Sequence, residues 1–247
     1  MSALRINGVS RSFGGVRAVD DVSFALEPAT VTALIGPNGA GKSTLFNLID
    51  GQLAPDAGSI EFEGRSLVDL PIAARTRAGI GRTFQVARTF ASMTVRQNAQ
   101  LALTAAAGHV YSVGAPLAGR ATDAADHLLQ QVGLSDRGDA PAAALAYGDL
   151  KRLEFALALA AAPRLLLMDE PTAGMAPGER TALMALVVAQ VRERRMTVLF
   201  TEHSMDVVFG FAERVLVLSR GRLIADGGAA QVRANPEVQA IYLGSEE

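Results

Sequence analysis

The chain has 247 residues, 49% of them hydrophobic, which is enough to bury a large core. Its 23 basic and 25 acidic residues leave a net charge of −2 and a pI near 6.0, so no broad basic face is expected and nucleic acid is disfavoured as a partner. The absence of cysteine excludes disulfides and thiolate metal sites.

No segment is expected to cross a membrane. The first residues, Met1–Asn7, lack an apolar signal core. The most apolar stretch, Phe155–Met168, is interrupted at Pro163 and is too short to span a bilayer. Any membrane role is therefore expected to be peripheral.

The first part of the chain predicts a small antiparallel sheet. Residues 3–9 and 21–26 have the composition of strands, and Gly58–Gly64 has the form of a further hairpin-like piece. Phe13 follows the first strand, a place where a phenylalanine is usually part of the core.

The next segment carries the most specific motif of the chain. Gly36–Ser43 fits the phosphate-binding pattern G-x-x-x-x-G-K-[ST] without a mismatch. Thr30–Ile35 before it predicts a buried strand, and Ser43–Ile49 after it predicts a helix that ends at Gly51. Strand, glycine loop and helix are the context that the motif requires.

The residues of this loop suit a polyphosphate. Its glycines let the backbone turn N–H groups toward an anion, and the helix N-terminus adds partial positive charge. Lys42, one of only two lysines in the chain, supplies an ammonium group for the β and γ phosphates, and the Ser43 hydroxyl is placed to bind Mg²⁺. The predicted nucleotide-binding residues here are Gly36, Pro37, Asn38, Gly39, Ala40, Gly41, Lys42, Ser43 and Thr44.

The remainder predicts a helical region followed by a return to the sheet. From about 92 to 160 the composition and spacing are helical, interrupted by a loose stretch at 108–119. Three short apolar runs follow at 164–169, 196–201 and 214–219, with helical sequence between the first two, as parallel strands require.

Polar residues at the ends of these strands complete a candidate site. Asp169 and Glu170 end one strand, where Asp169 can hold the Mg²⁺ shell and Glu170 can polarise an attacking water. His203 follows another strand and can donate to the γ phosphate. Gln85 lies between the sheet and the helical region, where its amide can contact Mg²⁺ or water.

Taken together, the motifs resemble the ATP-binding subunits of ABC transporters over essentially the whole chain. The residues that carry the resemblance are Gly36–Thr44, Gln85, Leu145–Asp149, Leu165–Glu170 and His203. The resemblance implies an α/β fold: a P-loop NTPase (RecA-like) core with an antiparallel β subdomain and an inserted helical subdomain. We expect one ABC ATPase domain over 1–247, with core and β subdomain at 1–85 and 163–247 and the helical subdomain, including the signature motif, at 86–162.

The resemblance also assigns roles by position. Phe13 would stack on adenine, Gln85 would be the Q-loop glutamine that reaches Mg²⁺, Glu170 the general base and His203 the switch histidine. ATP and Mg²⁺ are the implied cofactors. Two such subunits close head to tail around two ATP molecules and drive membrane-spanning partners, with the permease contact expected near residues 85–93.

Two loops depart from the common family pattern. Leu145–Asp149 stands where Leu-Ser-Gly-Gly-Gln is usual, so Ala146 lacks a hydroxyl, Tyr147 replaces a glycine and Asp149 replaces glutamine. Ala146, Tyr147 and Gly148 are still expected to contact the nucleotide of the opposite subunit, more weakly, because Gly148 and a helix beginning near Asp149 offer backbone N–H groups. Pro171–Pro177 lacks the usual D-loop aspartate.

These departures, with the C-terminal Asn235–Gly244, resemble the ATPases of branched-chain amino-acid uptake systems. The implied partners are transmembrane permease subunits, a second ATP-binding subunit and, indirectly, a periplasmic solute-binding protein. The implied location is the cytoplasmic face of the inner membrane. Uptake of amides, urea or aromatic acids, and a weakly hydrolytic ATP-responsive scaffold, remain alternatives.

Overall fold

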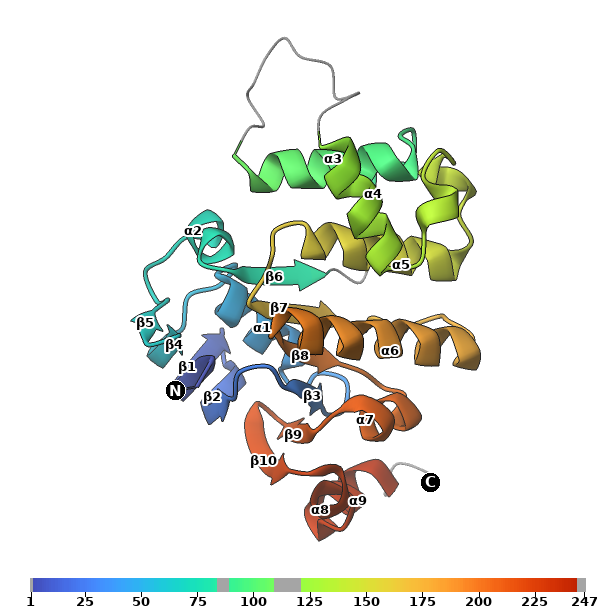
Figure 1. The fold of residues 1–247 in the computed structure, drawn as a ribbon. Helices are drawn as coiled ribbons and strands as arrows, with labels where there is room; N and C mark the ends of the chain where they lie inside the picture. The colour runs from blue at the N-terminus through green and yellow to red at the C-terminus, as the bar shows by residue number, and fades with distance from the viewer. Residues whose placement is uncertain (1, 84–88, 109–120, 244–247) are drawn as a thin grey trace.

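The computed structural model describes residues 2–83, 89–108 and 121–243, which form two sheets and a set of helices (Figure 1). One sheet has four strands in the order β2-β1-β4-β5, and the other has six in the order β10-β9-β3-β8-β7-β6. The expected α/β class, with a separate antiparallel sheet and helical parts, is confirmed.

The six-stranded sheet is the centre of the molecule. Its strands are β3 (Val31–Ile35), β6 (Ile80–Thr83), β7 (Leu165–Asp169), β8 (Thr197–Thr201), β9 (Arg214–Ser219) and β10 (Arg222–Gly227). All neighbouring pairs are parallel except β9 with β10. The three predicted apolar runs and Val31–Ile35 are therefore confirmed as parallel strands. The short β6 and the half-buried β10 carry weaker patterns, and the sequence did not predict them.

Both faces of this sheet are covered, which explains why the central strands β3 and β8 are buried at every position. Alternate residues of β3 enter different cores: Ala33 and Ile35 pack with the larger helices, whereas Leu34 packs with α1 (Lys42–Asp50) and the antiparallel sheet. The carboxyl ends of β3, β7 and β8 lie at one edge. The segments that follow them are therefore brought together, although they lie far apart in the sequence.

The antiparallel sheet consists of β1 (Leu4–Phe13), β2 (Val16–Leu26), β4 (Ala57–Phe62) and β5 (Arg65–Ser66). Its first two strands are longer than predicted because they continue to a two-residue turn at Gly14–Gly15, where Phe13 pairs with Val16. Gly14 has φ 57°, the left-handed conformation that such hairpin turns favour. In the sequence, the Gly14–Gly15 pair was the feature that could have predicted a hairpin turn here and therefore the longer strands.

Helices at 95–159 form the upper part of Figure 1, on the side of the sheet where β6 is the edge strand. They are α3 (Val95–Ala106), α4 (Thr122–Gln131) and α5 (Tyr147–Leu159). A capping box between Thr94 and Gln97 begins α3, and Leu128 and Leu129 of α4 join the main core. The predicted helical character is confirmed, but α5 begins at Tyr147 rather than near Asp149. The subdomain boundary at 86–162 stays a prediction.

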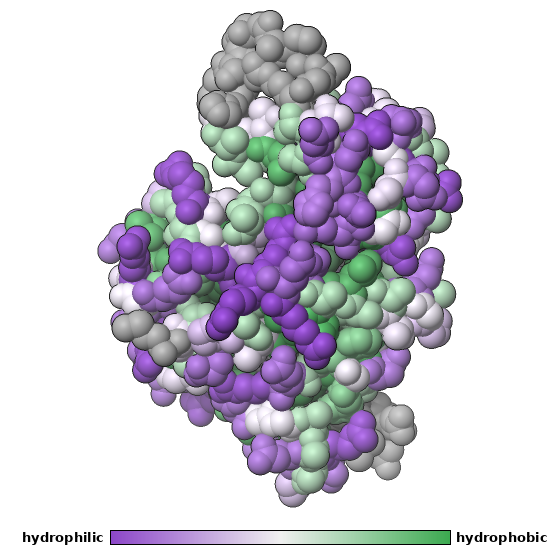
Figure 2. All heavy atoms as spheres, in the orientation of Figure 1, coloured by the Kyte–Doolittle hydropathy of each residue, from purple (hydrophilic) through white to green (hydrophobic). Residues whose placement is uncertain are grey.

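The remaining helices are α2 (Ile72–Arg77), α6 (Pro177–Arg194), α7 (Met205–Phe211), α8 (Ala229–Arg233) and α9 (Pro236–Leu243). Leu183 and Val187 of α6 pack into the same core as Met168 and Phe200 of the sheet. Helices α8 and α9 lie together beyond β10 (Figure 1). Among the described helices, none combines the length and the apolar character needed to cross a bilayer. Hydrophilic side chains are spread among smaller hydrophobic areas on the face drawn in Figure 2.

Candidate functional site

The glycine loop lies between β3 and α1 with little space around part of it. Gly41 has φ 104°, and a Cβ there would lie 2.2 Å from the Ala18 carbonyl oxygen of β2. Gly39 has φ 76°, but no atom lies within 4 Å of where its Cβ would be. The loop is therefore braced by β2 on one side and open at Gly39, which leaves room for an anion.

Lys42 is the first residue of α1 and its side chain folds back over the loop. Its Nζ donates to the Gly36 carbonyl at 2.6 Å and to the Pro37 carbonyl at 3.0 Å. Burial lowers the pKa of Lys42, and the negative charges of Glu170 and Asp169 oppose that shift. The structure therefore brings together the loop and the two acidic residues, which are more than 120 positions apart in the sequence. Ser43 and Thr44, in the first turn of α1, are exposed and half-buried.

Asp169 ends β7 with both carboxylate oxygens engaged. Oδ1 accepts a hydrogen bond from the Thr201 hydroxyl at 2.8 Å, and Oδ2 accepts one from Arg82 at 3.2 Å. Thr201 comes from β8, which pairs directly with β7 at this position. The sequence analysis predicted neither partner. Thr201 could have been found because it is the last residue of a predicted strand, at the same edge of the sheet as the acidic pair.

Glu170 follows Asp169 in the left-handed conformation, with φ 47°. Its backbone N–H donates to the carbonyl and to the hydroxyl oxygen of Thr201, both at 3.1 Å. Its Oε1 lies 3.0 Å from Nε2 of His203. The carboxylate and the imidazole, predicted separately as site residues, are thus adjacent at the edge of the sheet.

Glu202 is a buried carboxylate that sequence reasoning left without a role. Its Oε1 accepts hydrogen bonds from the Thr172 backbone N–H at 2.8 Å and from the Thr172 hydroxyl at 2.5 Å. Its Oε2 accepts one from the His203 N–H at 3.0 Å. Glu202 therefore connects the loop after Glu170 to the loop that carries His203, which limits their relative motion.

The signature segment lies at the N-terminus of α5, with Ala146 and Tyr147 exposed and Gly148 buried. The Tyr147 hydroxyl donates to the Ala173 carbonyl at 3.0 Å. A Cβ on Gly148 would lie 2.7 Å from Oε1 of Glu179. Within this chain the segment therefore contacts the loop that follows Glu170 and the start of α6.

Phe13 lies at the tip of the β1–β2 hairpin. It is 46% exposed, and the guanidinium of Arg11 is 5.1 Å from its ring centroid. The same hairpin contacts the phosphate-binding loop at Ala18. An exposed aromatic ring on an element that braces this loop suits a contact with a planar ligand. Gln85 lies outside the residues that the structure describes.

The described residues fit a magnesium nucleotide. The open space at Gly39, the ammonium of Lys42 and the α1 N-terminus match a polyphosphate, and the exposed Ser43 and the carboxylate of Asp169 supply oxygen ligands. Within the described ranges, no three His, Cys, Asp or Glu residues are grouped as a self-sufficient metal site. Magnesium commonly uses one or two protein oxygens and completes its shell with phosphate and water.

A mainly parallel sheet with a glycine loop before α1, an Asp-Glu pair at the end of β7 and a histidine after β8 defines a nucleotide-binding protein of the P-loop class. Two family profiles narrow this class. One, described as ABC transporter, matches residues 19–173, and the other, described as branched-chain amino acid ATP-binding cassette transporter, matches residues 222–247.

Curated relatives match nearly the whole chain. The branched-chain amino acid transport ATP-binding protein BraF of Pseudomonas aeruginosa is 37% identical over 98% of this chain and 97% of its own length. The corresponding LivG of Escherichia coli K12 is 38% identical with the same coverage. The chain belongs to the ATP-binding protein family of ABC transporters and is an ATPase of that family.

Solved structures agree with this placement. An ATP-binding cassette of an ABC transporter in its ADP conformation has a TM-score of 0.89 and 32% identity, covering 99% of this chain and all of its own. A nucleotide-free cassette has a TM-score of 0.86 and 32% identity, covering 98% of this chain and 99% of its own.

Proposed function

We propose that this chain is the ATP-hydrolysing subunit of an importer for branched-chain amino acids or related small polar solutes. The branched-chain amino acid transport function of BraF and LivG supports this substrate class, as does the branched-chain family profile on residues 222–247. Amide, urea and aromatic-acid uptake remain alternatives because the solute itself does not contact a subunit of this kind.

The observation that carries the proposed chemistry is the contact between Glu170 and His203, 3.0 Å apart, near the ammonium of Lys42. Lys42 exchanges its two backbone carbonyl acceptors for oxygens of the β and γ phosphates. Glu170 accepts a proton from a water whose oxygen bonds to the γ phosphorus while the bond from that phosphorus to ADP breaks. His203 contacts and orients Glu170 in the structure, and once nucleotide is bound its single N–H would donate to the γ phosphate instead.

Ser43 and Asp169, with Gln85, are the residues that would hold Mg²⁺. The ion, when bound, neutralises charge on the phosphate oxygens. The contribution of the protein is orientation: the Thr201 hydroxyl fixes one oxygen of Asp169, and the N-terminus of α1 presents the Ser43 hydroxyl. Phe13 is proposed to stack on the adenine ring.

The partner arrangement is part of the same proposal. A second ATP-binding subunit, this chain or a paralogue, would present its Ala146, Tyr147 and Gly148 to the nucleotide held by the P-loop here. Permease subunits would dock near residues 85–93, where Phe90 is 55% exposed. The complex would lie on the cytoplasmic face of the membrane. A periplasmic solute-binding protein would act through the permease.

The replacement of Glu170 by glutamine tests the chemistry. We expect Glu170→Gln to bind ATP with wild-type affinity and to lose roughly 100-fold or more in turnover, because the amide cannot accept the proton. Nucleotide affinity is measured by fluorescence titration and turnover by phosphate release from the reconstituted complex. Glu193→Gln, whose carboxylate contacts Gln190 on α6, is the matched control and should retain full turnover.

Wild-type turnover in Glu170→Gln would remove Glu170 as the base. The same measurement of phosphate release distinguishes an ATPase from the ATP-responsive scaffold. The scaffold alternative rests on the altered signature residues Ala146 and Tyr147. A wild-type complex that binds ATP and releases no phosphate would support the scaffold. Copurification of the permease, followed by uptake of labelled solutes, identifies the substrate.

A further inference from the structure

Arg82, at the end of β6, is the centre of a polar cluster that sequence reasoning did not predict. One terminal nitrogen donates to Oδ1 of Asn47 and to Oδ2 of Asp50, both at 2.6 Å. The other donates to Oδ2 of Asp169 at 3.2 Å. The side chain of Arg82 is 10% exposed, that of Asp50 9% and that of Asp169 16%, so these ion pairs are largely shielded from water.

The cluster joins three elements: the C-terminal half of α1, strand β6 and the end of strand β7. Because a guanidinium is planar, its two terminal nitrogens have fixed relative positions once it is held. Asn47 and Asp50 hold one side of the group, so the direction of the hydrogen bond to Asp169 is set by α1. The Thr201 hydroxyl binds the other oxygen of Asp169, which leaves the carboxylate little rotational freedom.

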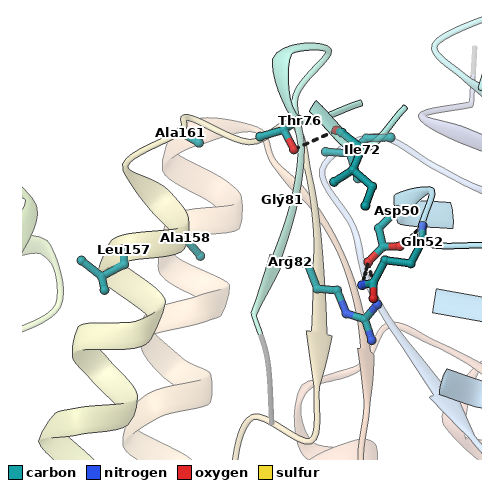
Figure 3. Close-up of a pocket in the computed structure, with 10 residues that line it drawn as sticks. Asp50, Gln52, Ile72, Thr76, Gly81, Arg82, Leu157, Ala158 and Ala161 are labelled. Atoms are coloured by element: carbon teal, nitrogen blue, oxygen red, sulfur yellow. Dashed lines mark hydrogen bonds and ion pairs between the residues drawn. The ribbon is translucent and has the colours of Figure 1, made fainter. Parts of the chain in front are cut away.

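The opposite end of the cluster reaches a surface pocket. Arg82, Asp50 and Gln52 form one wall of a cavity of about 400 Å³, whose other walls come from α2 and α5, as Figure 3 shows. Asp50 also accepts hydrogen bonds from the N–H of Gln52 at 3.0 Å and from its side-chain amide at 2.7 Å. A continuous chain of contacts therefore runs from the pocket wall to Asp169.

We propose that Arg82 is a positioning residue that orients Asp169 for the divalent cation accompanying the nucleotide, and that Asp50 anchors it. This inference rests on the proposed function, because it takes Asp169 as an oxygen ligand of that cation. Partners that orient metal-binding side chains typically change metal affinity by 10–100-fold when removed.

Two effects of Arg82 on the cation have opposite signs. Its positive charge repels a cation near Asp169, whereas its hydrogen bond holds the carboxylate in one orientation. Asp50 pairs with the same guanidinium at 2.6 Å and reduces its net field. We expect orientation to outweigh repulsion, because positioning partners typically contribute 10–100-fold to metal affinity, so loss of Arg82 should weaken cation binding.

The test measures Mn²⁺ binding by electron paramagnetic resonance on the full chain with saturating ADP, so that no turnover is involved. We expect Arg82→Gln to raise the dissociation constant of Mn²⁺ about tenfold. Arg82→Lys keeps the charge but loses the planar fork, and it should also weaken binding. Asp50→Asn, which is distant from the nucleotide loop, should weaken binding by a smaller factor because it loosens the anchor of Arg82.

Arg214→Gln is the matched control. Arg214 makes a similar two-nitrogen contact to Asp226, both bonds at 2.6 Å, between β9 and β10 and outside the site. Its loss should leave Mn²⁺ affinity unchanged, and ADP affinity in EDTA should be unchanged in every variant.

Equal or tighter Mn²⁺ binding by Arg82→Gln, relative to the wild type, would overturn the inference. If Arg82→Gln does not fold, wild-type affinity in both Arg82→Lys and Asp50→Asn would overturn it. Failure of the wild-type chain to bind Mn²⁺ with ADP is a different result, since it would contradict the proposed nucleotide site itself.

Discussion

The P-loop and the signature segment both lie at the N-terminus of a helix and both contain glycine, yet their surroundings differ. Helix α1 has no acidic residue in its first turn, so its N-terminal dipole is available to a phosphate. Helix α5 has Asp149 in its first turn, and Tyr147 and Gly148 contact residues of the same chain. This difference supports the proposal that the first loop holds an anion, whereas the second is held in place by contacts with its own chain.

The two lysines repeat this contrast. Lys42 donates to neutral backbone carbonyls of its own loop, so its ammonium group can exchange these acceptors for oxygens of an anionic ligand. Lys151 on α5 forms an ion pair with Glu154 at 3.0 Å, and both side chains are less than 10% exposed. The proposal that Lys42 binds a ligand agrees with these contacts, whereas the Lys151 ammonium is paired within the fold.

The largest expected effect separates these lysines. Lys42→Ala should abolish ATP binding and cost less stability than Lys151→Ala, because the described residues give the Lys42 ammonium backbone carbonyl acceptors and no ion pair. Lys151→Ala should keep ATP binding and lower the free energy of unfolding by about 3 kcal/mol, because it breaks a buried ion pair. Calorimetric titration with Mg·ATP and urea denaturation measure the two quantities. Unaltered ATP affinity in Lys42→Ala would refute the loop assignment.

A pair of glycine substitutions compares the packing around Gly41 of the P-loop and Gly148 in the first turn of α5. Gly41→Ala should destabilise the chain by about 3 kcal/mol, because the residue has φ 104° and a Cβ would lie 2.2 Å from the Ala18 carbonyl. Gly148→Ala should change stability by less than about 0.5 kcal/mol, because helix propensity gained offsets displacement of the flexible Glu179 side chain. Urea denaturation of both variants measures this contrast, and equal losses would contradict it.

A smaller effect is expected from the tyrosine hydroxyl. Tyr147→Phe removes the hydrogen bond to the Ala173 carbonyl and should cost about 0.5–1 kcal/mol, because the side chain is 47% exposed. Amide exchange should become faster in residues 171–176. Exchange at wild-type rates would mean that this contact does not restrain the loop.

The smallest expected effect concerns the ion pair between Arg222 of β10 and Asp20 of β2. The Arg222 guanidinium lowers the pKa of Asp20, and Arg17 adds to this effect. A lowered carboxyl pKa contributes stability above the unfolded-state value near 4, and that contribution is lost as the pH falls through the folded value. Arg222→Gln should therefore reduce the difference in unfolding free energy between pH 5 and pH 3, as measured by urea denaturation at both values. An undiminished difference would show that Arg222 is not the cause.

Much of the fold was predictable because its signals are local. The apolar runs of β3, β7 and β8 and the helical spacing between them indicated the parallel sheet, and the structure confirms it. The weaker elements, β6 and β10, were missed because short or half-buried strands lack a distinctive pattern. The start of α5 was placed two residues late, because Tyr147 is a poorer helix signal than the acidic Asp149.

The site divides in the same way. The sequence by itself determined the P-loop and the Asp169–Glu170 pair, since the required residue types are contiguous and each follows a recognisable strand. Only the tertiary structure decided that Arg82 joins α1 to Asp169, that Thr201 holds Glu170 and that Tyr147 contacts Ala173. These contacts join residues from 26 to 87 positions apart. They depend on strand order and loop direction, which no short stretch of sequence encodes.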